Sequence, residues 1–435
     1  MQHTALNLVA IAACLVAPIA APLAAQEVEQ PAPEVETDPA LQAALVALDI
    51  APVFDGHNDV PIQLRSRFNN QINGFDFADT SHTGEGDRNT MHTDLARLAE
   101  GHVGAQYWSV YVPASLPEPE AVQMTVEQID VMKRLIARYP DALAFAQTAD
   151  DVENAIAEGK VASMLGMEGG HSIGSSLGVL RQMYALGARY MTLTHSSNTP
   201  WADSATDDPE HGGLTDFGKD VVREMNRLGM LVDLSHVSEE TMMDALDVAG
   251  APVIFSHSGA RAINGHARNV PDSVLARLPE NGGIVMVVAL PGFLNDDQRQ
   301  WLAAREAEEA KQKSLFRGQP DVVARAMAEW DAGNPMPETD VGVMADHIDH
   351  IREVAGVEYI GIGGDFDGMP TGPVGFEDVS GYPQLFAELA RRGYSQVELE
   401  LIASRNAIRV LREAERYAAQ ASDRLPIETV LPSED

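Results

Sequence analysis

The sequence is almost free of cysteine, and its one thiol, Cys14, lies in an apolar stretch at residues 6–25. This stretch contains two prolines and ends in small residues before Gln26, which is typical of a cleaved secretory signal peptide. We therefore expect residues 1–25 to be a signal peptide and the protein to be secreted or periplasmic. The mature chain would have no disulfide, so its fold depends on core packing. The alternative is lipidation of Cys14, which would anchor the protein to a membrane.

Basic residues are also scarce, because 30 Lys and Arg stand against 65 Asp and Glu, for a formal net charge of −35. A field of this sign repels phosphate backbones and anionic headgroups, which argues against nucleic acid as a partner. The acidity is typical of a solvated surface. No long apolar run follows residue 25, so we expect no transmembrane span in the mature protein.

The division of the chain follows from composition. Residues 26–40 are rich in Pro and Glu and are expected to form a flexible leader. Residues 41–420 are expected to form one domain, since barrels of roughly 250 residues or more occur as single units. Residues 421–435 are expected to form a C-terminal tail.

Eight short apolar runs rich in β-branched residues recur along the body, most of them separated by segments with helical periodicity. They span residues 52–55, 106–112, 162–166, 188–193, 231–234, 252–255, 283–290 and 359–363. This alternation favours parallel βα units, and eight strands close a barrel. We therefore predict an α/β fold, a single (β/α)8 barrel of the TIM type.

Outer helices are predicted at residues 121–139, 214–228, 238–248 and 395–419, the last of which begins with the capping pair Ser395 and Glu398. Residues 295–336 are highly charged with helical spacing. We expect them to form a helical insertion on the loop side after the seventh strand, where a dimer contact is one alternative to a solvated surface.

Histidine and acidic residues follow six of these eight runs almost at once. In chain order they are His57 and Asp59, Glu168, His195, His236, His257, and Asp365 with Asp367. Each has a structural alternative, since a lone histidine is usually a hydrogen-bonding group and Asp59 or Asp365 could cap a helix. The carboxyl ends of barrel strands share one rim, however, where the active sites of this fold are built. Coincidence at six strand ends therefore favours one functional site.

Imidazole and carboxylate ligands without thiolate suit Zn²⁺, and also Mn²⁺, Fe²⁺ or Ni²⁺. His57 and Asp59 stand two residues apart on an extended segment, so they can reach one ion. His236 and His257 can hold a second ion, and the two oxygens of Glu168 can bridge the pair.

The other histidines are expected to be peripheral to this site. His171 and His266 stand near the motifs and are expected to support the ligands. The rest are expected to be surface or structural residues, namely His82, His92, His102, His211, His347 and His350.

Nine motifs together give the sequence a close resemblance to the membrane dipeptidases, also called renal dipeptidases, among the amidohydrolase-like metal-dependent hydrolases. They are DGHND at 55–59, YWSVY at 107–111, EGGHSI at 168–173, LTHS at 193–196, NTPWAD at 198–203, DLSHVS at 233–238, FSHS at 255–258, RNVPD at 268–272 and GIGGDFDG at 361–368. They run in order over nearly the whole expected mature chain.

The resemblance implies a zinc-dependent dipeptidase with two Zn²⁺ per chain, which hydrolyses the amide bond of dipeptides by a metal-bridged hydroxide. It agrees with the five ligands assigned above. By the same resemblance, His195 contacts the substrate, Arg268 holds its terminal carboxylate, and Asp365 is the catalytic aspartate that also contacts the substrate. Asp367 is a near-equal candidate for the catalytic role because it stands in the same turn.

Two departures from vertebrate members limit what the resemblance implies. Those members carry a disulfide at the position of Ser197, so a dimer of this chain would be a non-covalent homodimer. Residues 287–291 and the charged insertion also differ from vertebrate members, and both are expected to border the pocket, so side-chain preference does not carry over. A related amidohydrolase acting on N-acyl amino acids or β-lactams is the alternative activity, and a catalytically silent zinc-binding barrel is a third reading.

Overall fold

The computed structural model describes residues 38–84 and 89–431. The expected signal peptide at 1–25, Cys14 and residues 26–37 of the expected leader lie outside the described residues. The first helix, α1 (Pro39–Ile50), begins at Asp38, whose carboxylate accepts a hydrogen bond from the Ala40 amide. Of the expected C-terminal tail, the structure describes residues 421–431. Ile427 and Thr429 in this part hydrogen-bond to residues of a barrel helix.

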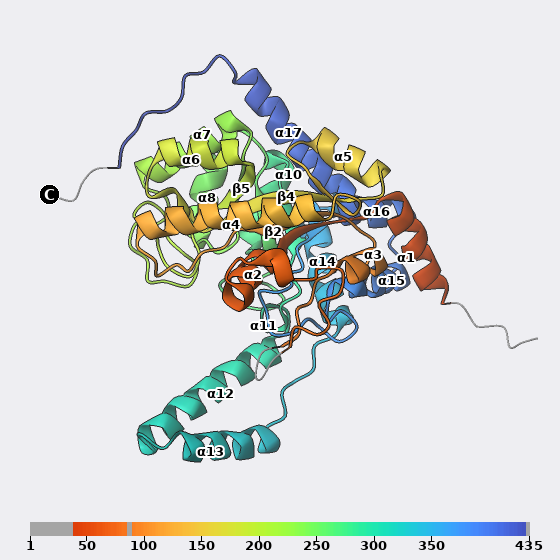
Figure 1. Ribbon diagram of the computed structural model, residues 1–435, viewed down its shortest axis with the longest axis vertical. Helices are drawn as coiled ribbons and strands as arrows, with labels where there is room; N and C mark the ends of the chain where they lie inside the picture. The colour runs from red at the N-terminus through yellow and green to blue at the C-terminus, as the bar shows by residue number, and fades with distance from the viewer. Residues whose placement is uncertain (1–37, 85–88, 432–435) are drawn as a thin grey trace, which may run out of the picture. The chain divides into compact units, whose positions relative to one another are not determined.

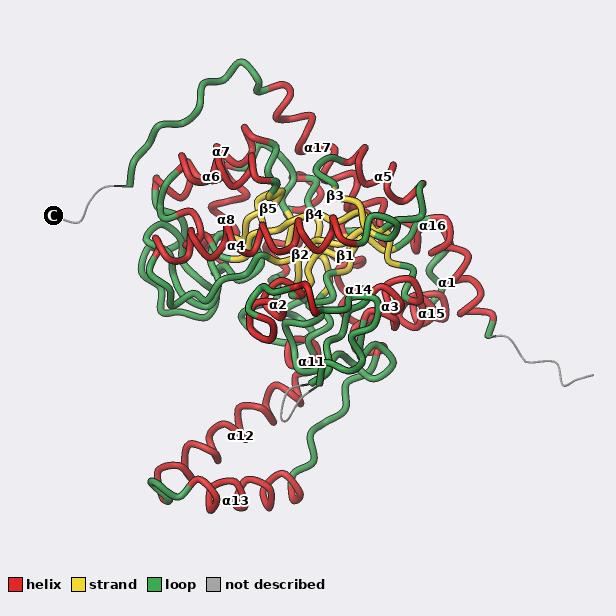
Figure 2. The backbone as a smooth tube through the Cα atoms, in the orientation of Figure 1, coloured by secondary structure: helices red, strands yellow, loops and turns green. Residues whose placement is uncertain are grey.

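The strands form a closed parallel barrel, seen at the centre of the fold in Figure 2. Its members are β1 (Val53–Asn58), β2 (Val103–Ser109), β4 (Val161–Glu168), β5 (Ala188–Thr192), β6 (Leu231–Asp233), β7 (Ile254–Ser258), β8 (Ile284–Val287) and β9 (Ile360–Ile362). Each pairs with the next in this order, and β9 returns to β1. The predicted (β/α)8 barrel and its eight strands are confirmed. One short strand that the sequence pattern did not reveal, β3 (Leu143–Phe145), pairs with the start of β4.

Helices surround the strands, as Figure 1 shows. They are α2 (Val60–Phe68), α3 (Leu95–Glu100), α4 (Glu118–Arg138), α5 (Ala149–Ala157), α6 (Leu177–Leu186), α7 (Asp216–Leu228), α8 (Glu239–Val248), α9 (Asp272–Leu275), α10 (Leu278–Asn281), α11 (Pro291–Leu294), α12 (Asp296–Leu315), α13 (Pro320–Gly333), α14 (Val341–Val354), α15 (Tyr382–Arg391), α16 (Gln396–Glu400) and α17 (Asn406–Gln420). None of the helices in residues 38–84 and 89–431 has the length and apolar character needed to cross a membrane.

The four predicted outer helices are present as α4, α7, α8 and the segment from α16 to α17. The last is continuous but contains a π-helical turn at Leu401–Arg405, which the sequence pattern did not indicate. Its predicted capping box is confirmed, because Ser395 accepts from the Glu398 amide and Glu398 accepts from the Ser395 amide.

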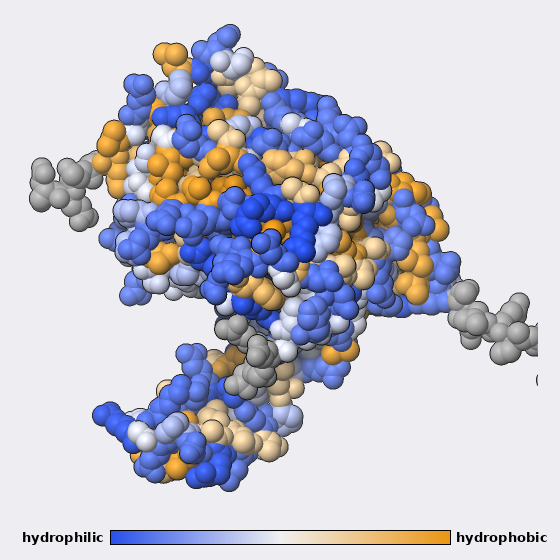
Figure 3. Space-filling view, in the orientation of Figure 1, coloured by the Kyte–Doolittle hydropathy of each residue, from blue (hydrophilic) through white to orange (hydrophobic). Residues whose placement is uncertain are grey.

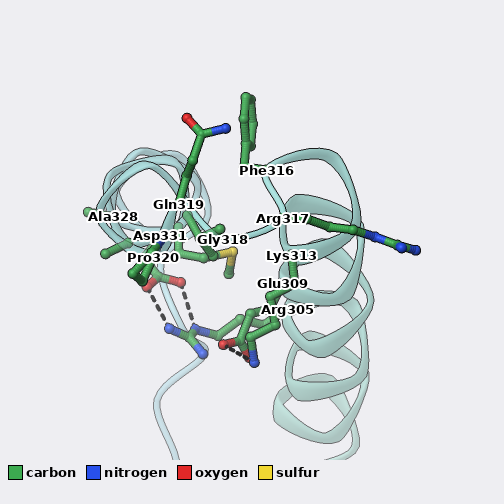
Figure 4. Close-up of a pocket in the computed structure, with 13 residues that line it drawn as sticks. Arg305, Glu309, Lys313, Phe316, Arg317, Gly318, Gln319, Pro320, Ala328 and Asp331 are labelled. Carbon is green, nitrogen blue, oxygen red and sulfur yellow. Dashed lines mark hydrogen bonds and ion pairs between the residues drawn. The ribbon is translucent and has the colours of Figure 1, made fainter.

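The charged insertion after the seventh barrel strand is confirmed as a helical hairpin of α12 and α13 (Figure 1). The two helices contact each other, and α12 contacts α11 at its base. Trp301 and Trp330 pack with ring centroids 5.7 Å apart. Figure 4 shows the groove between the helices, where Arg305 pairs with both oxygens of Asp331 at 2.8 and 3.0 Å. The hairpin surface is largely hydrophilic, with scattered apolar residues (Figure 3).

The core has two layers because successive strand residues point to opposite faces. Alternate residues fill the barrel interior, among them Phe54, Tyr107, Met164, Tyr190 and Met286, while their neighbours pack against the outer helices. On β4 the buried residues Met164, Gly166 and Glu168 share the inner face. The apolar layer therefore occupies one end of the barrel, and polar side chains continue it at the carboxyl end.

Replacement of Gly363 tests the closeness of this packing. A Cβ at Gly363 would lie 1.8 Å from the Ser256 carbonyl oxygen, whereas one at Gly74 would meet nothing within 4 Å. We expect Gly363→Ala to lower the free energy of unfolding by about 3 kcal/mol. Gly74→Ala should change it by less than about 0.5 kcal/mol. Urea denaturation measures both, and equal midpoints for the two variants would contradict the described barrel closure.

Candidate metal centre

The predicted site residues come from different strands and meet at the carboxyl end of the barrel. His57 lies near the end of β1, Asp59 follows it, Glu168 ends β4, and His257 lies on β7. His236 and Asp365 follow β6 and β9 in the left-handed region, with φ of 70° and 60°. All six are buried, and His195 after β5 is partly exposed.

The carboxylate of Glu168 lies at the middle of this group. Its Oε1 atom is 2.9 Å from Nε2 of His236 and 3.5 Å from Nε2 of His257. Its Oε2 atom is 3.5 Å from Nε2 of His57 and accepts a hydrogen bond from Ser109 at 3.1 Å. The two oxygens of one carboxylate therefore face two different sets of imidazole nitrogens.

His57 connects Glu168 to the other two acidic residues. Its Nε2 atom lies 3.3 Å from Oδ2 of Asp59 and 4.0 Å from Oδ1 of Asp365. This nitrogen is fully buried and has no hydrogen bond to any part of the chain that the structure describes. A buried polar atom without a partner is costly, so the arrangement calls for a ligand at this point.

The donor atoms fit a divalent metal. Three groups each bring their ligand atoms within 4.8 Å of one another: His57 with Glu168 and His257, Glu168 with His195 and His236, and His57 with Asp59 and Asp365. The Nε2 atoms of His236 and His257 lie only 3.0 Å apart, both directed to the same space. Imidazole and carboxylate donors without a thiolate suit zinc and its neighbours among the transition metals.

The grouping differs in detail from the pairs expected from the sequence. His236 and His257 do share the Oε1 side of Glu168, as expected. His257 also lies against His57, with ring centroids 3.8 Å apart, and His195 joins His236 with its Nε2 atom 3.6 Å from Oε1 of Glu168. The rim is narrow enough that both sides of the centre share neighbours.

Burial sets the protonation of these groups in the metal-free chain. It lowers the pKa values of His236 and His257 well below the ordinary range, so both imidazoles are neutral and have a free lone pair. Burial raises the pKa of Glu168, but the charge of His57 and the hydrogen bonds from His236 and His57 together outweigh it, and the net pKa is well below the usual range. Burial raises the pKa of Asp365 well above normal, and the nearby Asp59 and Glu168 add to the effect.

Asp365 and Asp367 stand in the same turn but contact different histidines. Asp367 accepts a hydrogen bond from the His92 amide at 2.9 Å, and its own amide donates to Nδ1 of His92 at 3.1 Å. Asp365 is the one that faces His57. His92, expected to be a surface or structural residue, is thus buried and holds the neighbouring turn.

Arg268 lies in the loop after β7, with its guanidinium buried beside the centre. Its Nη atoms make only long contacts, 3.5 Å to Ser258 Oγ and 3.4 Å to the His257 carbonyl, and its Nε has no partner among the described residues. Burial lowers its pKa to about 10. The ring of Phe293 lies 5.3 Å from this guanidinium, and His266 accepts from the Arg268 amide. The guanidinium therefore has donors left for an anion.

These groups line a pocket of about 320 Å³. Its lining residues are Asp59, Ile62, Gln63, Tyr111, Glu168, His195, His236, His257, Arg268, Leu290, Phe293, Asp365, Asp367 and Gly368. Leu290 lies in the segment 287–291 that was expected to border the pocket, whereas the apolar members Ile62 and Phe293 and the ring of Tyr111 were not foreseen. They come from loops and helix starts, where a single sequence carries no periodic signal.

Two hydroxyl groups close to the centre were also missed. Ser109 ends β2 and donates to Glu168, and the hydroxyl of Tyr190 on β5 lies 2.9 Å from Nδ1 of His57. Both stand inside apolar runs, so the sequence pattern assigned them to the core. A polar side chain at the carboxyl end of such a run is the signal that could have found them.

The remaining histidines lie elsewhere. His171 makes a hydrogen bond to the Val112 carbonyl. His347 is buried between the Ala260 amide and the Leu294 carbonyl, and His350 pairs with Asp272. His102 and His211 contact Asp49 and the Thr199 carbonyl. None of these contacts of the five histidines, on the residues the structure describes, reaches the centre.

The chain is similar to known dipeptidases in sequence and in fold. The family model for membrane dipeptidases, peptidase family M19, matches residues 42–424. Dipeptidase 3 of Mus musculus is 40% identical over 402 residues, covering 91% of this chain and 71% of that protein. The probable dipeptidase PvdM from Pseudomonas aeruginosa has a similar fold, with a TM-score of 0.73 at 24% identity, covering 87% of this chain and 99% of that one. A metallopeptidase from Rhodobacter sphaeroides, solved with a phosphinate mimic of the dipeptide L-Ala-D-Ala, has a TM-score of 0.66 at 25% identity, covering 84% and 99%.

Addition and removal of metal test the fit of the centre. A cation that binds only the folded chain stabilises it by about 4 kcal/mol when its free concentration exceeds its Kd about a thousandfold. We therefore expect Zn²⁺ to raise the midpoint of thermal unfolding and a chelator to reverse the rise. His350→Ala, remote from the centre, should keep the rise, and Glu168→Gln should lose it. A rise that is equal in wild type and Glu168→Gln would place the metal elsewhere.

Proposed function

Since the chain belongs to the membrane dipeptidase family, we propose that it hydrolyses the amide bond of dipeptides with two zinc ions held at the described centre. His57 and Asp59 would hold one ion, His236 and His257 the other, and Glu168 would bridge them. When bound, the zinc ions supply an activated water and a Lewis acid for the scissile carbonyl.

One observation carries this proposal: the two oxygens of Glu168 face different histidines, His57 on one side and His236 on the other. A carboxylate placed in this way suits two cations far better than one. Three carboxylates are buried around this point, and cations would offset their loss of hydration. The buried neutral imidazoles have free lone pairs for the same cations.

The pocket suggests how a dipeptide would lie. Arg268 would bind the C-terminal carboxylate through its unused donors, as a guanidinium binds a carboxylate in a bidentate manner. Because the cavity measures about 320 Å³, it suits a short substrate. The loop that carries Arg268 would thus fix the scissile amide over the metal ligands.

His195 and Asp365 would carry the proton transfers and charge stabilisation. Asp365 faces the ligands with its Oδ1 atom 4.0 Å from His57, and would take a proton from the attacking water and pass it to the leaving amine. His195, partly exposed at the pocket wall, would donate a hydrogen bond to the developing oxyanion. Asp365, and not Asp367, belongs to one of the three groups of candidate ligand atoms among the described residues, which supports Asp365 for the catalytic role.

We further propose that the protein acts outside the cytoplasm. The support is the composition of residues 1–25, with its apolar stretch, prolines and small-residue end. Cleavage there would remove Cys14. Fractionation of cells that express the full chain, followed by N-terminal sequencing of the product, tests this proposal.

The direct test of the activity uses the purified, zinc-loaded chain. It is assayed on a panel of dipeptides that includes L-Ala-D-Ala, because a related metallopeptidase was solved with a mimic of that dipeptide. N-acetyl amino acids and a β-lactam are assayed beside them. Hydrolysis of dipeptides with the higher kcat/KM supports the proposal. Preference for N-acetyl amino acids or the β-lactam would make the related amidohydrolase activity the correct one.

Arg268→Ala should impair binding of the substrate carboxylate. Charge-assisted hydrogen bonds to a carboxylate contribute about 3 kcal/mol, so KM for dipeptides should rise about 100-fold. Dipeptide amides, which lack the carboxylate, serve as the matched control. Wild type should discriminate strongly against the amides, and Arg268→Ala should not. If wild type hydrolyses both equally well, Arg268 has no role in carboxylate binding.

Asp365→Asn should retain zinc and lose turnover. Loss of a general acid and base typically lowers kcat about 10²- to 10⁴-fold. Asp367→Asn, two residues further along the same turn, should lower kcat far less. Steady-state kinetics with zinc analysis checks both variants, and the reverse order of effects would exchange the two roles.

A further inference from the structure

A buried carboxylate, Asp233, lies beneath the metal centre and takes no part in the scheme above. It ends β6, and its side chain is completely buried. Oδ1 accepts hydrogen bonds from the amides of Ser235 at 3.1 Å and Ser256 at 2.8 Å. Oδ2 accepts from the hydroxyl groups of Thr192 at 2.5 Å and Ser256 at 2.6 Å. Two amides and two hydroxyl groups therefore surround the two oxygens, so each oxygen is placed to accept two hydrogen bonds.

Ser256 connects this carboxylate to His257. Its Oγ atom lies 2.8 Å from Nδ1 of His257. A serine hydroxyl has one proton, and Asp233 can only accept it, so Ser256 must accept from His257. Nδ1 of His257 therefore carries hydrogen, and Nε2, which faces Glu168 at 3.5 Å, has the free lone pair that a metal requires.

Tyr190 extends the same network to His57. Its hydroxyl lies 2.9 Å from Nδ1 of His57, and the Ser256 side chain interacts with the same hydroxyl and lowers the pKa of Tyr190. The second lone pair of Ser256 can accept from Tyr190, which leaves the tyrosine oxygen free to accept from His57. Nε2 of His57, which faces Asp59 and Glu168, is then the ring nitrogen left to bind a metal ion.

We propose that Asp233 is a positioning residue for both metal ions: through Ser256 it sets the tautomer of His257, and through Ser256 and Tyr190 that of His57. This inference rests on the proposed function, because His57 and His257 are assigned there to different ions. It adds a residue that reaches both halves of the centre without contacting either metal. Metal-bound histidines usually need such an acceptor on the other ring nitrogen.

The direction of the hydrogen bonds yields a specific test in Asp233→Asn. If the amide group of asparagine faces Ser256, it donates where the carboxylate accepted. Ser256 then donates to Nδ1 of His257, and the proton on that ring moves to Nε2, which cannot bind metal in that form. Loss of a partner of this kind typically weakens metal binding about 10- to 100-fold.

The experiment measures zinc affinity by competition with a chromophoric chelator, on the full folded chain, with the unfolding midpoint of each metal-free variant recorded. Asp233→Asn and Ser256→Ala should each weaken zinc binding about 10- to 100-fold. Tyr190→Phe should weaken only one of the two binding steps, since it contacts His57 alone among the ligands. If Asp233→Asn does not fold, the serine and tyrosine variants still decide the matter.

Three matched controls separate positioning from general stability. Glu224→Gln removes another fully buried carboxylate. Glu224 pairs with Arg181 and Arg227, which are not among the proposed metal ligands. Ser163→Ala removes another buried serine hydroxyl, and Tyr107→Phe removes a buried hydroxyl with no partner among the described residues.

All three controls should bind zinc as wild type does. Wild-type affinity in Asp233→Asn and Ser256→Ala, or equal weakening in the controls, would overturn the inference. Failure of wild type to hold two zinc ions would instead overturn the proposed function, so the two failures are distinguishable.

Discussion

The carboxylate of Glu168 is the point on which the rest of the site depends. Its Oε1 atom faces His236 and His257, and its Oε2 atom faces His57. His257, which also lies against the ring of His57, is the neighbour that the two sides share. Placement of this carboxylate on the inner face of β4 requires the alternation that also puts Met164 in the core below it. The fold and the chemistry are thus linked through one strand.

The electrostatics of the site make sense only with cations present. Asp59, Glu168 and Asp365 are buried together, and burial raises the pKa of Asp365 well above its ordinary range. In the metal-free chain, the charge of His57 is the main compensation for Glu168. Divalent cations would compensate the charge of Glu168 in place of His57, and His57, His236 and His257 would then be neutral. Acidic side chains collected at the rim in this way suit a metal centre, and the residues proposed for catalysis and substrate binding, His195, Asp365 and Arg268, line the same pocket.

Much of the fold was predictable because each barrel strand is a buried, β-branched run that differs sharply from the helices around it. The exceptions have physical causes. The strand β3 is three residues long, Leu143–Phe145, and has no β-branched residue. The π-helical turn at Leu401–Arg405 has the same apolar spacing as the α-helix around it, so periodicity did not reveal it.

The meeting of the proposed ligand residues was predictable for a related reason, since polar side chains at the ends of apolar runs must meet at one rim. Their grouping was not, because the 3.8 Å contact between His57 and His257 depends on the tilt and width of the barrel. The supporting residues were hidden in two ways. Tyr190 stands in an apolar run and reads as core, and His92 meets Asp367 across 275 residues of sequence from a loop without a pattern.

The central claim is that two zinc ions lie on either side of Glu168. Anomalous diffraction at the zinc edge, from crystals of the zinc-loaded chain, tests it most directly. The account predicts two peaks, one between His57 and Asp59 and one between His236 and His257, with the Glu168 carboxylate between them. A single peak, or peaks away from Glu168, would contradict it.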